Sequence, residues 1–145
     1  MHAPDVDLMY DRNIVLKAVQ IEGFTLQFAS NELQQDREIV LKAIEQNGVA
    51  IRFASNEWKN NREMVLKAIE INGCAFYFCS RELRMDRELL LKAVKLNGST
   101  LKIVEDQFKN DREFVEEAAK HSGFAATYSH NLYLLRMREY YDSII

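Results

Sequence analysis

The side chains with the greatest potential for chemistry are few in this sequence. The candidate nucleophiles and metal ligands are two cysteines, Cys74 and Cys79, and three histidines, His2, His121 and His130. Two cysteines without a second pair do not complete the four ligands of a structural zinc site. No spacing indicates a Ser-His-Asp or Cys-His arrangement, and no phosphate-binding glycine loop is present. The sequence therefore predicts a protein that is not an enzyme and that needs no metal or cofactor.

Composition restricts the remaining classes of function. The chain has 145 residues, of which 48% are hydrophobic and 28% charged, with a net charge of −3. We expect one domain over residues 1–145 with its own core, without the basic footprint of many nucleic-acid-binding proteins. No apolar run is long enough for a membrane span, and the start lacks the pattern of a secretory signal. With two cysteines expected as reduced thiols, the prediction is a cytoplasmic protein.

Arginine recurs every 25 residues, each time directly after Asp or Asn: Arg12, Arg37, Arg62, Arg87 and Arg112. An acceptor stands five residues before each of them: Asp7, Glu32, Glu57, Glu82 and Gln107. If a helix begins at each arginine, the cation lies at the partially positive end of that helix, which is unfavourable. We therefore expect a structural ladder of partly buried pairs, in which the planar guanidinium binds the acceptor across the preceding turn. Replacement of such an arginine should cost about 1–3 kcal/mol of stability.

A helix is the element expected to position these residues. Asp or Asn supplies an N-cap oxygen, and a glycine that also recurs every 25 residues is expected to end the helix in a left-handed conformation. In one unit Ile39, Val40, Ala43 and Ile44 share an apolar face, and the small alanine indicates close approach of a neighbouring helix. Glutamate and lysine form the opposite face as i,i+4 pairs: Glu38–Lys42, Glu63–Lys67 and Glu88–Lys92.

The second half of each unit has an ambiguous pattern, as in "FTLQFASNEL". Leu26 and Phe28 flank a polar Gln27, which is typical of a strand, whereas Thr25, Phe28 and Ala29 fit a helix. Short runs are not resolved by periodicity alone. We favour a short helix, and a short strand in each repeat of an α/β solenoid is the alternative.

Because one helix pair does not bury its apolar face alone, stacked units predict a solenoid. The predicted fold is all-α, with about five helix-turn-helix repeats of 25 residues. The expected boundaries are an N-terminal half-repeat at 1–10, repeats at 11–35, 36–60, 61–85, 86–110 and 111–135, and a C-terminal capping helix at 131–145.

At these repeated positions the sequence resembles a known family of tandem repeats, domain of unknown function 4116. The stretch "DREIVLKAIEQNGVAIRFASNEWKN" carries the shared pattern of Asp-Arg-Glu, aliphatic residues, Asn-Gly and an aromatic-Ala-Ser run. The resemblance covers residues 6 to about 130, although "LKIVEDQF" lacks Ala-Ser and "ATYSHNLY" lacks the acid. It implies tandem helical units and no particular activity.

A protein-binding scaffold, or a structural subunit of a larger assembly, is the function that this architecture favours. Residues that differ between units while facing outward should carry specificity: Gln27, Arg52, Tyr77, Lys102 and Thr127. Tyr140 and Tyr141 in the closing segment are a second candidate surface, unless that segment only caps the stack. The alternative function is binding of nucleic acid or another polyanion through a line of lysines, Lys17, Lys42, Lys67 and Lys92. Nucleic acid is the less favoured partner, because most of these lysines have a glutamate one helical turn before them.

Overall fold

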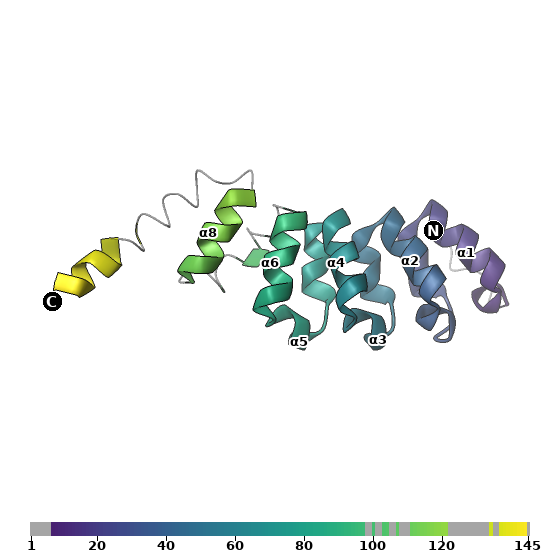
Figure 1. Cartoon of the computed structure of the whole chain (residues 1–145). Helices are drawn as coiled ribbons and strands as arrows, with labels where there is room; N and C mark the ends of the chain where they lie inside the picture. Colours follow the sequence, from purple (N-terminus) through teal and green to yellow (C-terminus); the bar gives the residue numbers. More distant parts are fainter. Residues whose placement is uncertain are drawn as a thin grey trace.

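The computed structural model is an elongated stack of helical repeats (Figure 1). It describes residues 7–97, 100, 103–104, 107, 111–121, 134 and 137–144. Throughout this part of the chain the regular elements are helices, with no strand among them. The predicted all-α repeat architecture is therefore confirmed, and the α/β alternative is not the fold.

The first element of each repeat is an α-helix of ten residues: α1 (Arg12–Ile21), α2 (Arg37–Gln46), α4 (Arg62–Ile71), α6 (Arg87–Leu96) and α8 (Arg112–His121). The Asp11 carboxylate accepts hydrogen bonds from the backbone N–H groups of Asn13 and Ile14. The later cap residues each accept from the N–H three positions on, at 2.9–3.1 Å: Asp36, Asn61, Asp86 and Asp111. The expected N-caps are confirmed.

These α-helices lie side by side in chain order along the stack (Figure 1). Their buried faces follow the predicted pattern, because Ile39, Val40, Ala43 and Ile44 are all fully buried. Together with side chains from the other two elements of each repeat they form one continuous core. Each of α1, α2, α4 and α6 thus packs against the α-helix of the next repeat.

The glycine after each helix has a different role from the one expected. No glycine in the described residues has a positive φ, and Glu22, Asn47 and Asn72 end their helices in extended conformations. A Cβ atom on Gly23 would lie 2.5 Å from the Ala43 carbonyl oxygen. The prediction of a left-handed helix end is wrong here. Glycine is required because its backbone lies directly against the backbone of the alanine in the next helix. The small alanine had already indicated a close approach at this point of the helix.

The second element is a 3-10 helix: η2 (Gly23–Phe28), η4 (Gly48–Phe53) and η5 (Gly73–Phe78). Successive 3-10 helices contact one another along the stack, and each also packs on the α-helices. Buried residues recur every three positions in this element: Gly23, Leu26 and Ala29, and their equivalents Gly48, Ile51 and Ala54, and Gly73, Phe76 and Cys79. Ala50 and Ala75 are buried beside this stripe. The interval of three matches the three residues per turn of a 3-10 helix, and it explains why neither the strand nor the α-helical period fitted.

The third element is a single short turn of helix: η1 (Leu8–Tyr10), η3 (Leu33–Gln35), α3 (Asn56–Lys59) and α5 (Arg81–Arg84). Backbone N–H groups of Ser30, Ser55 and Ser80 donate to carbonyl groups of the preceding repeat at 2.9–3.1 Å. The Trp58 indole N–H donates to the Gln35 carbonyl oxygen at 2.7 Å. In the first three repeats the unit is therefore an α-helix, a 3-10 helix and a short turn of helix, whereas in the fourth the described residues 100, 103–104 and 107 are α-helical.

The closing segment is helical over residues 137–144. This helix lies beyond α8 at the end of the stack (Figure 1). Tyr140, Tyr141 and Ile144 are exposed by 58–62%, so these side chains do not cover the repeat before them. A capping role for the segment remains a prediction.

Candidate functional site

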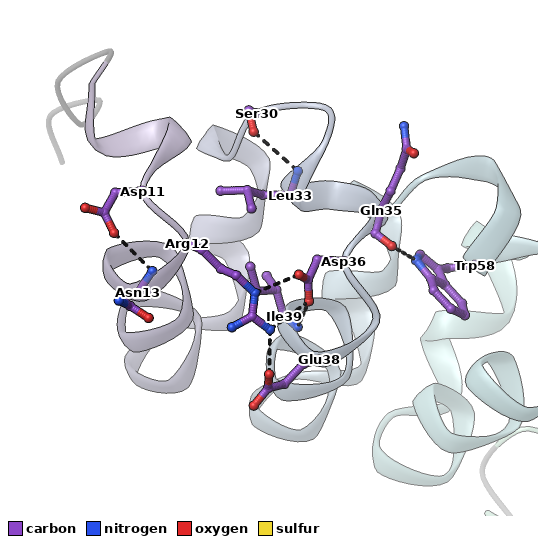
Figure 2. A network of polar contacts seen from close by, with 10 residues as sticks. All are labelled: Asp11, Arg12, Asn13, Ser30, Leu33, Gln35, Asp36, Glu38, Ile39 and Trp58. Carbon is purple, nitrogen blue, oxygen red and sulfur yellow. Dashed lines mark hydrogen bonds and ion pairs between the residues drawn. The ribbon is translucent and has the colours of Figure 1, made fainter.

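The recurring arginines do form a ladder of ion pairs, but four of them bind forward to the next repeat. Arg12 Nε lies 2.8 Å from Asp36 Oδ2, and Arg12 Nη2 lies 3.3 Å from Asp36 Oδ1. The same Nη2 lies 2.5 Å from a carboxylate oxygen of Glu38 (Figure 2). One guanidinium therefore bridges α1 to the N-cap and the first turn of α2.

Arg62 and Arg87 follow the same pattern, whereas Arg37 and Arg112 depart from it. Arg62 pairs with Asp86, and Arg87 Nε lies 2.7 Å from an Asp111 carboxylate oxygen. At the equivalent cap the residue is Asn61, which has no carboxylate, and among the described residues Arg37 pairs with Glu63 at 3.4 Å. Arg112 pairs with Glu116 of its own helix and with Glu139 of the closing helix. We call this series of five arginines and their acceptors the arginine ladder.

The prediction that each arginine pairs with the acceptor five residues before it was wrong. Asp7, Glu32, Glu57 and Glu82 are exposed, and in the part of the chain that the structure describes none of them pairs with the arginine that follows it. Gln107 also binds elsewhere, donating its side-chain amide to the Arg84 carbonyl oxygen at 3.0 Å. The pairs instead join Arg12, Arg62 and Arg87 to the N-cap aspartate of the α-helix in the next repeat.

The ladder is more exposed than expected. Its arginine side chains are 39–57% exposed rather than partly buried. Exposed ion pairs contribute about 0.2–1 kcal/mol, so the larger loss expected on replacing an arginine is not supported. Two of the three i,i+4 pairs also differ from expectation, because Glu38 and Glu63 bind ladder arginines while only Glu88–Lys92 forms, at 3.7 Å.

The ladder lowers the pKa of its cap carboxylates. For Asp36 and Asp111 the main cause is the hydrogen bond from the arginine of the preceding repeat. For Asp86 the N-cap hydrogen bond from Leu89 N–H contributes most, followed by Arg62. The carboxylates are therefore held ionised, and the arginines that bind them are occupied. This arrangement is structural and leaves little capacity for external anions.

The lysine line is also partly neutralised. Lys42 and Lys67 both lie within 3.8 Å of carboxylate oxygens of Glu45, and Lys92 lies near Glu88. Lys17 is exposed. Three of the four lysines thus have an acidic neighbour, although Lys42 and Lys67 share one, and this lowers the attraction of the line for a polyanion.

A different surface runs along the 3-10 helices, and it contains the residues predicted to carry specificity. Gln27 of η2, Arg52 of η4 and Tyr77 of η5 are all exposed, at the same position of three successive repeats. We call this the 3-10 surface. The ring of Tyr77 packs against buried Phe76 with centroids 5.9 Å apart. Lys102 and Thr127, which would extend the series, lie outside the described residues.

The environment of Arg52 was not predicted from the sequence. Its guanidinium carbon lies 5.4 Å from the ring centroid of Phe53 and 5.4 Å from that of Phe78. Both phenylalanines are partly buried against the core, and Phe53 packs edge-on against Phe24 of the preceding repeat. The available signal was the recurrence of an aromatic residue directly after the variable position, in Phe28, Phe53 and Phe78.

The cysteines differ in environment. Cys74 is exposed and Cys79 is buried, and both are free thiols. Burial raises the pKa of Cys79 to about 11, so its thiolate is scarce at neutral pH.

Across the described ranges, no three His, Cys, Asp or Glu side chains gather closely enough to hold a metal ion. His2 and His130 lie outside those ranges. Within the same ranges no helix has the length and apolar content needed to cross a membrane.

One family model matches the chain three times in tandem, over residues 11–59, 36–84 and 86–133. Its description is domain of unknown function (DUF4116). The matches begin at Asp11, Asp36 and Asp86, each of which is the N-cap of a repeat. Neither the search of curated proteins nor that of solved structures found a match.

Proposed function

We propose that this chain, which belongs to the family described as domain of unknown function DUF4116, is a non-catalytic scaffold that binds protein partners through its 3-10 surface. The observation that carries the proposal is the series Gln27, Arg52 and Tyr77, exposed at equivalent positions of adjacent repeats. Their chemistry changes from repeat to repeat, while the glycine, alanine and aspartate positions around them recur. Solenoids commonly bind partners along such a surface.

The proposal is supported by how rigidly the surface is held. Leu26, Ile51 and Phe76, one residue before each exposed position, are buried in the core. Side chains fixed by a packed scaffold lose little conformational entropy on binding, which favours affinity. Tyrosine and arginine are also the residue types most often found as anchors at protein interfaces.

Polyanion binding has less support. The ladder arginines are engaged with carboxylates, and three lysines of the lysine line have glutamates nearby. A role as a structural subunit would use the same surface with a permanent partner. We place the protein in the cytoplasm, as an expectation based on two free thiols, which persist in reducing compartments.

The test is affinity capture from native extract at low and high salt, with mass spectrometry and ultraviolet absorbance. The bait is compared with a variant in which Gln27, Arg52 and Tyr77 are all alanine, and with a control carrying alanine at Lys42, Lys67 and Lys92. A defined set of proteins that survives high salt, and is lost only with the first variant, would support the scaffold. Nucleic acid released as salt rises, and lost with the lysine variant, would overturn it.

A further inference from the structure

Arg52 differs from the ladder arginines in what surrounds its guanidinium. Each ladder arginine is engaged with one or two carboxylates. In the part of the chain that the structure describes, the only partners recorded for the Arg52 side chain are the rings of Phe53 and Phe78. Aromatic rings interact with the charge and the flat face of a guanidinium. They accept none of the strong in-plane hydrogen bonds that its N–H groups donate to carboxylates.

The two rings make Arg52 a prepared anion receptor. Phe78 belongs to the next repeat, so the guanidinium lies across the junction between η4 and η5. Holding the guanidinium in place reduces the entropy lost when it forms two parallel hydrogen bonds. The ligand group that matches a planar pair of N–H donors is a carboxylate, which accepts both bonds at once.

The flanking positions favour an extended peptide as the carrier of that carboxylate. Gln27 and Tyr77 lie one repeat away on either side, are exposed, and are uncharged. Packed helices lie about 8–10 Å apart, and an extended chain advances about 3.3 Å per residue. Residues about three apart in an extended ligand would therefore meet successive repeats. The expected pattern is an acid opposite Arg52, with an amide-bonding residue and an apolar or aromatic residue about three positions to either side.

We propose that Arg52 binds a side-chain carboxylate of an extended acidic segment in the protein partner, with Gln27 and Tyr77 contacting residues on either side of it. This rests on the proposed function, because it specifies the chemistry of the partner that the 3-10 surface recognises. It assigns Arg52 a binding role and gives the ladder arginines a structural one.

The test begins with selection of binders from a displayed library of random peptides by the purified full chain. Selected peptides are then measured by fluorescence anisotropy against the wild type, Arg52→Gln, Arg52→Lys and Arg37→Gln. Arg37→Gln is the matched control, since it removes the same charge from an exposed arginine on the α-helical face that has a single ion pair at 3.4 Å. We expect peptides rich in Asp and Glu, about ten-fold weaker binding for Arg52→Gln, a smaller loss for Arg52→Lys, and unchanged binding for Arg37→Gln.

A second measurement needs no variant. The Nε–Hε resonance of Arg52 in the wild type is followed by NMR as a selected peptide, or its counterpart with Gln for each acid, is added. We expect that resonance to shift with the acidic peptide alone. Selected peptides without acid enrichment, or equal binding by Arg52→Gln, would overturn the inference while leaving the scaffold in place. Failure to capture any salt-stable protein from extract would instead overturn the proposed function. Binding of a single-stranded oligonucleotide that depends on Arg52, with no peptide selected, would contradict both.

Discussion

Gly48 lies against Ala68 of the following helix so closely that a Cβ atom added to the glycine would come within 2.2 Å of the alanine carbonyl oxygen. The same relationship joins Gly23 to Ala43. Each pair joins the start of a 3-10 helix to the middle of the next α-helix. The contact sets the distance between repeats, and therefore the spacing of the exposed residues on the 3-10 surface.

Substitution of Gly48 by alanine should destabilise the protein by about 1–3 kcal/mol, because the added methyl group must displace backbone atoms of the next helix. Chemical unfolding in urea measures this. Gly48→Asn serves as the comparison, since asparagine tolerates a left-handed backbone better than alanine does. We expect the asparagine variant to be at least as unstable as the alanine variant. If asparagine restored stability, the packing explanation would be wrong.

Asn61 interrupts the arginine ladder, and Asn61→Asp should restore it. Aspartate and asparagine are similar as N-caps, so the gain should come from a new pair with Arg37. We expect an increase of about 0.2–1 kcal/mol in the free energy of unfolding. A double-mutant cycle with Arg37→Ala isolates the pair energy. Stabilisation that persists fully in the absence of Arg37 would show that the aspartate acts only on its own helix.

Stability should fall in acid. The folded-state pKa values of Asp36 and Asp111 are lowered chiefly by the arginine of the preceding repeat. A depressed pKa contributes stability that is fully present above the unfolded value, about 3.9. That contribution is lost as pH falls from there through the folded value. Urea unfolding of the wild type and of Asp36→Asn, from neutral pH to below about pH 4, measures this loss of stability. The asparagine still caps its helix, as Asn61 does, but it carries no charge. The deficit of the variant should shrink as pH falls. A constant deficit across this range would contradict the assignment.

The two thiols should react at very different rates. Cys74 is exposed, whereas Cys79 is buried with a pKa raised to about 11. A thiol reagent at neutral pH should label Cys74 in the native protein and reach Cys79 only after unfolding. Cys74→Ser should therefore abolish native labelling, and mass spectrometry of the labelled peptides reads this directly. Rapid labelling of Cys79 in folded protein would show that the packing around this buried thiol opens readily.

Local features of this fold were predictable from the sequence. An N-cap needs only a short polar side chain before a helical pattern, so Asp11, Asp36 and Asp86 were identified correctly. The buried face of α2 followed from the helical period. The choice between helix and strand in the second half was less secure, because a 3-10 stripe such as Gly48, Ile51 and Ala54 matches neither common period.

Contacts between repeats were harder to predict, for a reason inherent in a periodic sequence. An acid five residues before Arg12 and a cap 24 residues after it recur equally regularly, so spacing alone does not choose between Asp7 and Asp36. Only the packing of α1 beside α2 decides the direction. The glycines were misread for a similar reason, since a helix-terminal glycine serves either a left-handed turn or a close contact. The two rings around Arg52 come partly from the next repeat, so its environment depends on the same packing.

The most direct test of the central claim is site-specific photocrosslinking in native extract. A photoreactive amino acid replaces Tyr77 on the 3-10 surface in one sample, and Glu63, an 81% exposed residue of α4, in another. We expect a discrete protein adduct from position 77 that is lost with Arg52→Gln, and none from position 63. Adducts formed only from position 63, or crosslinks to nucleic acid from either position, would contradict protein binding through the 3-10 surface.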